Sequence, residues 1–455
     1  MKKKLLVALS STLAVAMALP AFAKDHSING FFRTRFMMTD FDNSRSEDGP
    51  TKIVDQRFRA KWTMGLNEYV SVTYYGEVDM QWGDLSYAGY GADGHRTTRN
   101  DGGRLGGDTV NLETKNLYLN VKIPDTPVSA RVGLQGYADH WNYSLFAADM
   151  AGLKFSAKTD MVSGNVAWFK WGEGAQTADN TENDIDLYAV QAAFQPIGGL
   201  SLGADFYWLN VNGAGYGSAG FSNADIYWLG VNGKYKIGPA ALSGWVAYNF
   251  GTADSAAANG DDLDISAFAG SVAAAFSPME GVKAKLLALY FSGDDDSGDT
   301  DQNSWTIPQS GEDFFFGTEG FMLMMADLYW TTWGFEGFGE GAVVSGNGLW
   351  AVALTGQYNP PAMKGVYVKG GVGYFSAVED DRTPNDGADD HDGTGLGTEV
   401  FVRTGMKVAE TVDVSLNAAY AFLGDYFNDM AVDDDGKTDD PNNPYELYVM
   451  VNVPF

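Results

Sequence analysis

The end of the chain carries its clearest pattern of apolar and polar positions. Over residues 445–455 every second residue is apolar, whereas the residues between them include Glu446 and Asn452. A period of two is typical of a β-strand with one apolar face and one more polar face. We therefore expect a strand here, with its odd-numbered side chains on the apolar face.

The same alternation recurs along the chain in runs of about ten residues, separated by turns or by loops rich in Gly and Asp. The predicted strands are 26–41, 52–66, 70–82, 109–123, 128–136, 151–158, 163–171, 184–195, 200–211, 225–237, 241–250, 263–276, 282–292, 348–358, 365–377, 396–408, 411–424 and 445–455. Segment 321–347 stays unplaced, because Phe321 to Trp333 would form a loop helix, a plug or an extra strand pair. The expected count is about 18, with 16 or 20 as alternatives.

The connections between these runs alternate between short turns and long loops. Asn67-Glu68 and 124–127 are short, whereas 83–108 and 293–347 are long. Short turns at one rim and long loops at the other are typical of a transmembrane antiparallel β-barrel with periplasmic turns and extracellular loops. Hydrocarbon offers backbone groups no partner, so a sheet that spans a membrane must close. A large soluble sandwich is the alternative all-β fold.

The first residues predict export. Lys2, Lys3 and Lys4 precede an apolar run, and Ala21-Phe22-Ala23 follows it as a small-residue cleavage site. We expect 1–23 to be a cleaved secretory signal, with a retained membrane helix as the alternative, and 24–455 to be one barrel domain. The chain has no cysteine, so hydrogen bonds rather than disulfides must hold the exported fold.

Charge and aromatic residues narrow the function. The formal net charge of −29 argues against a nucleic-acid partner. Trp208, Trp245 and Trp350 fall near predicted strand ends, where aromatic side chains gather at the two membrane interfaces.

The closing strand and its terminal aromatic resemble those of bacterial outer-membrane barrels. That resemblance implies that Phe455 belongs to the signal read by the barrel-assembly machinery. It also implies a place in the outer membrane of a Gram-negative cell, in contact with lipid and lipopolysaccharide.

Basic residues share one face of several predicted strands. On the first two strands these residues alternate with the apolar residues Phe32, Phe36 and Phe58. Charged side chains are costly against lipid, so this face should line the lumen. The predicted pore-lining basic wall comprises Arg33, Arg35, Arg57, Arg59, Lys61 and Arg131. A solvated face of a soluble sheet is the alternative.

The third long loop, 137–150, resembles the inward loop of general trimeric porins. Carried over by position, Asp139, His140 and Asp149 would lie on this constriction loop, opposite the basic wall. Opposed charges would set up a transverse field that orients polar solutes. The loop lacks the Pro-Glu-Phe-Gly-Gly element of those porins, and a loop that only covers the rim is the alternative.

Among porins, the chain looks most like the homotrimeric porins of sulfate-reducing bacteria. This resemblance implies a homotrimer that passes small hydrophilic solutes and ions by passive diffusion. The alternatives are a structural or adhesive barrel closed by loop 293–347, and a barrel hydrolase built around a loop histidine. Neither H-E-x-x-H nor G-x-S-x-G is present, so we expect no catalysis.

Acidic residues cluster in the long loops. Asp294, Asp296, Asp299 and Asp301 are candidate ligands for Ca²⁺ or Mg²⁺, which prefer oxygen donors. Their spacing is not that of an EF-hand, so a solvated loop is the alternative. We expect no cofactor beyond such ions at the extracellular loops.

Overall fold

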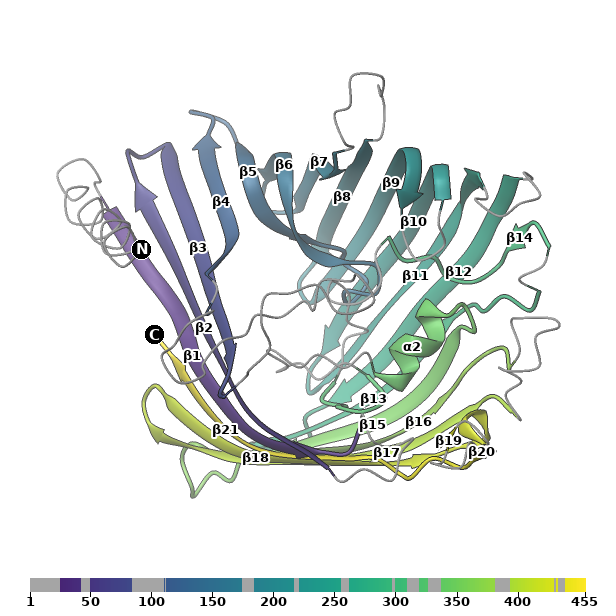
Figure 1. The fold of residues 1–455 in the computed structure, drawn as a ribbon. Coiled ribbons are helices and arrows are strands. Elements are labelled where there is room, and N and C mark those ends of the chain that lie inside the picture. The colour runs from purple at the N-terminus through teal and green to yellow at the C-terminus, as the bar shows by residue number, and fades with distance from the viewer. Residues whose placement is uncertain are drawn as a thin grey trace, which may run out of the picture.

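The computed structural model is a closed antiparallel barrel of 18 strands (Figure 1). The structure describes residues 25–41, 50–83, 110, 112–173, 184–216, 221–254, 262–296, 299–308, 319–325, 337–380, 393–428, 431–432 and 438–455. The predicted signal 1–23 lies outside these residues. The first strand pairs with the last, from Phe31↔Pro454 to Thr39↔Glu446, and this pairing closes the barrel.

All the predicted strands are present. The first nine are β1 (Asp25–Thr39), β2 (Thr51–Gly65), β3 (Val70–Gln81), β4 (Glu113–Lys122), β5 (Val128–Ala138), β6 (Ala147–Lys158), β7 (Val162–Gly172), β8 (Ile185–Ile197) and β9 (Leu200–Tyr216). The other nine are β10 (Phe221–Ile237), β11 (Ala240–Asp254), β12 (Asp262–Phe276), β13 (Val282–Phe291), β15 (Leu349–Tyr358), β16 (Val366–Ser376), β17 (Gly395–Ala409), β18 (Val412–Leu423) and β21 (Tyr445–Pro454).

The remaining elements are short and lie between barrel strands. They are β14 (Asp301–Gln302), α2 (Phe338–Val344), the 3-10 turn η2 (Asp425–Phe427), and the two-residue strands β19 (Ala431–Val432) and β20 (Thr438–Asp439). β14 pairs in parallel with β12, and β19 pairs with β20. Among the described residues, no helix combines the length and the apolar character that crossing a membrane requires.

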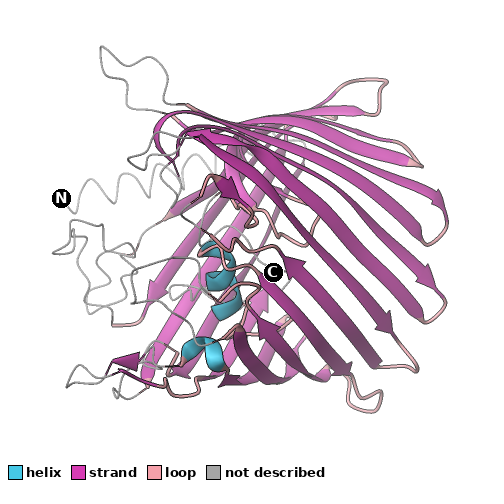
Figure 2. Cartoon of the chain, turned by 90° about the vertical axis from the view of Figure 1, so that its right-hand side faces the viewer, coloured by secondary structure: helices cyan, strands magenta, loops and turns pink. Residues whose placement is uncertain are grey.

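The connections have the predicted asymmetry. Short turns such as that between β2 and β3 gather at one end of the tilted strands, and α2 lies toward the other end (Figure 2). The described residues of segment 321–347, which are 321–325 and 337–347, contain α2 and no barrel strand. The rest of the predicted element from Phe321 to Trp333 lies outside the described residues, and the barrel has the expected 18 strands.

The two faces of each strand differ as the alternation predicts. On β21, Leu447 and Val449 are exposed, whereas Glu446, Tyr448 and Met450 are buried inside the barrel. Every second side chain of an antiparallel strand points to the same face, so the odd-numbered residues form the outer surface. Phe455 joins this surface, where its ring stacks on Phe58 at 6.0 Å between centroids.

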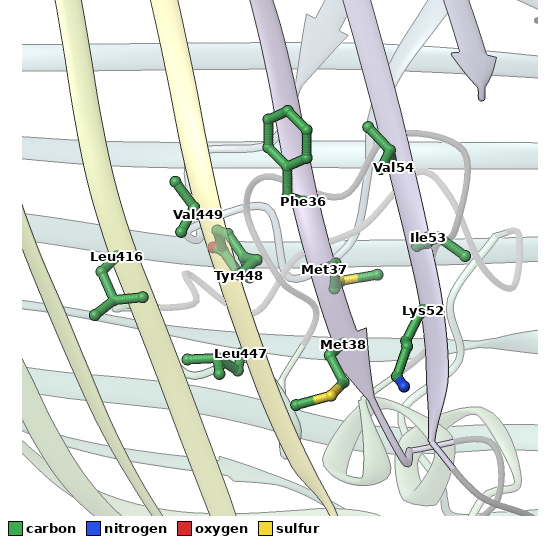
Figure 3. A pocket seen from close by; sticks show the side chains of 10 residues that line it. All are labelled: Phe36, Met37, Met38, Lys52, Ile53, Val54, Leu416, Leu447, Tyr448 and Val449. Atoms are coloured by element: carbon green, nitrogen blue, oxygen red, sulfur yellow. The ribbon is translucent and has the colours of Figure 1, made fainter.

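A groove of about 390 Å³ lies at the seam where the last strands meet the first (Figure 3). Its lining comes from β18, β21, β1 and β2 and includes the exposed side chains Phe36, Leu416 and Leu447. The exposed part of this lining places the groove at the apolar outer surface of the barrel.

Candidate functional site

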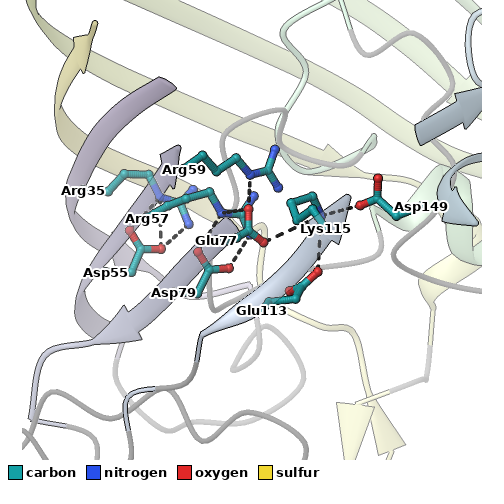
Figure 4. Close-up of polar contacts among 9 residues, drawn as sticks. All are labelled: Arg35, Asp55, Arg57, Arg59, Glu77, Asp79, Glu113, Lys115 and Asp149. Carbon is teal, nitrogen blue, oxygen red and sulfur yellow. Dashed lines mark hydrogen bonds and ion pairs between the residues drawn. The ribbon is translucent and has the colours of Figure 1, made fainter. Parts of the chain in front are cut away.

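Charged side chains form a continuous row on the inner face of β1 to β4 (Figure 4). Arg35 faces Asp55 in the β1–β2 register, and their side chains are 1% and 0% exposed. Arg35 Nη2 donates to Asp55 Oδ2 at 2.5 Å while its Nε donates to Oδ1 at 3.1 Å. A bidentate pair of this kind fixes the geometry as well as the charge.

The row continues across β2 and β3 because the register places arginines opposite acids. Arg57 faces Asp79, and the two side chains are 2.5 Å apart at their nearest atoms. Arg59 faces Glu77 and donates to it through Nε. Opposite charges directly across an antiparallel pair stabilise the sheet and set its register.

Lys115 carries the row on to β4 and β6. Its Nζ lies 3.8 Å from Glu77 Oε1 and 2.9 Å from Asp149 Oδ2. Asn116 also donates to Asp149 Oδ1, at 2.6 Å. We call this set the charge ladder; its members are Arg35, Asp55, Arg57, Asp79, Arg59, Glu77, Lys115 and Asp149.

The six residues of the predicted basic wall all lie on the inner face. Arg33, Arg35, Arg57 and Arg59 come from β1 and β2, opposite the exposed rings of Phe32 and Phe58. The ammonium of Lys61 lies 5.9 Å from the centroid of the Tyr75 ring. The guanidinium of Arg131 lies 4.3 Å from the centroid of the Tyr118 ring. Their part in permeation stays a prediction.

The wall differs from the prediction in its charge. The arginines alone predict a basic strip, whereas Asp55, Glu77 and Asp79 make this wall a row of alternating charges. The signal was present, because these acids share the inward-facing alternation of their own strands. What was missing was the register that sets each acid opposite an arginine.

Residues 139–146 form an inward hairpin between β5 and β6, which bend into the barrel interior (Figure 1). The Asp139 carboxylate accepts hydrogen bonds from the backbone N–H groups of four residues of this hairpin. The donors are Trp141 at 2.6 Å, Tyr143 at 3.0 Å, Leu145 at 2.8 Å and Phe146 at 2.9 Å. Asn142 and Tyr143 have positive φ, so the carboxylate holds a backbone that side chains rarely adopt.

Aromatic rings dock the inward hairpin on the barrel wall. Trp141, fully buried, packs edge-on against Tyr207 of β9 at 5.1 Å and stacks on Trp245 of β11 at 6.2 Å. Trp245 therefore faces the interior, and the prediction that it belongs to a membrane interface is wrong. Trp305, from the connection after β13, contacts Trp141 at 6.5 Å and donates to Ser144 O at 3.2 Å.

His140 ties the hairpin to β9 through a polar contact. Its Nδ1 lies 3.0 Å from Asp205 Oδ1, and Asn232 of β10 donates to the other oxygen of Asp205 at 2.9 Å. The imidazole side chain is 45% exposed, whereas that of Asp205 is fully buried. The hydrogen bond to Asp205 raises the pKa of His140 above its ordinary value, against the lowering effect of burial.

The predicted arrangement of Asp139 and Asp149 is wrong. Asp149 extends the same charged wall through Lys115, so it does not oppose that wall from across the lumen. Asp139 is 3% exposed and its oxygens are taken by the hairpin's own amides. Burial raises the pKa of Asp139 to about 6, although the four backbone hydrogen bonds lower it. Of the three predicted constriction residues, His140 has the most exposed side chain.

The acidic run after β13 does not assemble the candidate ion site. Asp294 is 2% exposed and accepts from the Asn303 amide at 3.4 Å, and Asp299 accepts from the Asp301 amide at 2.8 Å. Within the described part of the chain, which includes Asp294, Asp296, Asp299 and Asp301, no group of three or more His, Asp or Glu side chains is placed to hold a metal ion.

Comparison with solved structures shows which barrels share this fold. OccAB1 of Acinetobacter baumannii aligns with a TM-score of 0.57 at 11% identity, covering 95% of this chain and 97% of that one. OprD of Pseudomonas aeruginosa aligns with a TM-score of 0.55 at 13% identity over 95% and 96%. The chain has the fold of these porins. A BenF-like porin from Pseudomonas fluorescens aligns with a TM-score of 0.56 at 11% identity over 95% and 99%.

Comparison by sequence finds no match. No protein-family model matches the chain, and no curated protein matches it. The structural neighbours support an outer-membrane porin fold, but they do not support the narrower resemblance to the homotrimeric porins of sulfate-reducing bacteria.

Proposed function

We propose that the protein is an outer-membrane porin, which passes small hydrophilic solutes and ions by passive diffusion through a water-filled lumen. The observation that carries this proposal is a closed barrel with an apolar outer surface and a ladder of charged side chains on its inner wall. A barrel of this strand number is too wide for side chains alone to fill. The similar fold of OprD and OccAB1 supports the same function.

Reconstitution in a planar lipid bilayer tests the proposal. The folded protein should give discrete conductance steps, and a salt gradient should give a reversal potential that reports ion preference. A correctly folded barrel that leaves the bilayer sealed would instead favour the structural or adhesive alternative. The observation that favours that alternative is the connection between β13 and β15, whose described parts fold into the barrel and contact its wall and the inward hairpin.

The barrel hydrolase is the other alternative with an observation in its favour. It requires a loop histidine close to a carboxylate, and His140 is hydrogen-bonded to Asp205. It also requires a hydroxyl nucleophile near the second ring nitrogen. Among the described residues, Asp205 is the one side chain hydrogen-bonded to His140, so the nucleophile is missing from this arrangement. If the protein shows no esterase or protease activity that is lost on replacing His140, this alternative is removed.

The proposal has three further parts. They are assembly as a homotrimer, a place in the outer membrane with lipid and lipopolysaccharide around the barrel, and recognition of Phe455 by the barrel-assembly machinery. The exposed apolar outer surface, of which Phe455 is part, supports them. Light scattering of the detergent-solubilised protein measures its mass and hence its oligomeric state. Deleting Phe455 should lower the amount of barrel in the outer-membrane fraction.

A further inference from the structure

A second segment inside the barrel, residues 319–325, is held by a carboxylate of the barrel wall. Glu399 lies on the inner face of β17 and is 0% exposed. Its Oε1 accepts from the Met322 amide at 2.7 Å, and its Oε2 accepts from Leu323 at 3.1 Å and from Met324 at 2.8 Å. One side chain of the wall thus binds three successive amides of a connection that lies some 75 residues earlier in the chain.

An aromatic slot on the same β16–β17 wall also holds this segment. Phe321 packs edge-on against Phe375 of β16 at 5.3 Å and against Phe401 of β17 at 5.1 Å. Gly373, on the inner face of β16, makes room for it, since a Cβ there would lie 2.9 Å from the Phe321 ring and 2.8 Å from the Phe375 ring. Closure of the barrel does not require the contacts of Phe321 with Phe375 and Phe401, because they are not part of the pairing between neighbouring strands.

The backbone enters this segment in an unusual conformation that the wall also supports. Glu319 and Gly320 both have positive φ, 34° and 113°, and Glu319 is ion-paired with Lys285 of β13. A non-glycine residue in the left-handed region persists only where the surroundings impose it. The amides of Phe338 and Gly339 donate to Leu323 O and Met324 O at 3.0 and 2.7 Å, so α2 is fastened to the same segment.

We propose that Glu399 is a positioning residue for the pore: it keeps segment 319–325 and the attached α2 against the β16–β17 wall, and thereby sets the open cross-section of the lumen. This proposal rests on the proposed function. The buried Glu399 carboxylate accepts three charge-assisted hydrogen bonds, which hold the segment more strongly than bonds to water would. A glutamine at this position would turn its own N–H₂ group toward a backbone N–H, which is a donor and cannot accept a hydrogen bond. Removing the carboxylate should therefore release the segment.

Two variants separate this role from the loss of a charge. Glu399→Gln keeps the volume and removes one acceptor, and Gly373→Ala leaves all charges in place but forces Phe321 or Phe375 to move. Gly356→Ala is the matched control, because a Cβ on this outward-facing glycine of β15 meets its nearest neighbour at 3.8 Å. Heat-modifiable migration on gels shows whether each barrel is closed.

Single-channel conductance in planar bilayers is the first measurement. We expect Glu399→Gln and Gly373→Ala to change the conductance of the folded channel in the same sense, toward larger or more strongly fluctuating steps, and Gly356→Ala to leave it unchanged. If wild-type protein conducts and both test variants match it, the positioning role is wrong. If Glu399→Gln does not fold, Gly373→Ala decides.

A thiol measurement keeps the inference testable even if wild-type protein does not conduct, an outcome that would overturn the proposed function. The chain has no cysteine, so Met324→Cys introduces one thiol at a fully buried position of the segment. A water-soluble thiol reagent should label it slowly in the otherwise wild-type barrel and faster when Glu399→Gln is added. Equal labelling rates would show that Glu399 does not hold the segment.

Discussion

The charge ladder and the inward hairpin both bury carboxylates inside the barrel, but they satisfy them with different partners. Asp55 in the ladder is paired with the side chain of Arg35, whereas Asp139 in the hairpin is bonded to four backbone amides. Side-chain partners can be exchanged together by mutation, and backbone partners cannot. The ladder should therefore tolerate matched replacement, while the hairpin depends on one residue that has no substitute.

The largest effect is expected from Asp139→Ala. Four buried amides would lose their acceptor, and each unsatisfied group costs about 1–3 kcal/mol. Partial relaxation and entry of water would reduce the sum, so we expect a loss of about 3–5 kcal/mol in the free energy of unfolding. Urea unfolding of the protein in lipid vesicles measures it. Asp160→Ala, at an exposed turn between β6 and β7, is the control and should change little.

The next largest loss of stability is expected from Arg35→Met. Recovery of that stability by a second substitution would distinguish the charge ladder from the inward hairpin. Alone, Arg35→Met leaves Asp55 buried without its bidentate partner, which costs about 3 kcal/mol. Replacing both residues, Arg35→Met with Asp55→Leu, should restore stability to within about 1 kcal/mol of wild type, because an apolar pair fills the same space. If the double variant is as unstable as Arg35→Met, the paired side chains of the ladder cannot be replaced together either, and the distinction from the hairpin is wrong.

The ladder should also govern ion preference, which the hairpin's Asp139 cannot do because its oxygens are occupied. Arg57→Glu with Arg59→Glu would place two acids beside Asp79 and Glu77 and make this wall strongly negative. The reversal potential in a salt gradient should shift toward cations. The neutral pair Arg57→Gln with Arg59→Gln should give a smaller shift of the same sign. An unchanged reversal potential would remove both arginines from the permeation path.

The barrel itself was predictable from sequence because alternation is a local property. A strand such as 70–82 shows both of its faces without reference to any other part of the chain, and each predicted run corresponds to a strand. The inner position of Arg57 and Arg59 followed from the same alternation. The pairing of these arginines with Asp79 and Glu77 did not, since it depends on a register that spacing along one strand does not fix.

The inward segments were harder to predict because their determinants are distant in sequence. Asp139 looked like a lumen acid, and only the hairpin's backbone conformation shows that it binds amides. The position of Trp245 near a strand end predicts an interface residue, whereas in the structure its ring packs against Trp141 inside the barrel. Segment 321–325 has no periodicity of its own, and the residue that holds it, Glu399, lies on the third barrel strand further along the chain.

The smallest effect is expected from pH, through the contact that joins the hairpin to the wall. The pKa of His140 is raised by its hydrogen bond to Asp205, so folding favours the protonated imidazole. A raised pKa gives stabilisation that is complete below the ordinary value of about 6.5 and is lost as pH rises through the folded value.

The groups facing His140 are Asp205, Asp139, and Asn232 of β10, which is hydrogen-bonded to Asp205. Docking of the hairpin should therefore weaken from about pH 6.5 upward, and current fluctuations of the open channel should increase. His140→Gln keeps a hydrogen-bond donor but cannot titrate, so its fluctuations should be independent of pH over this range. If wild type and His140→Gln respond to pH alike, the pH dependence does not arise from His140 and its contact with Asp205.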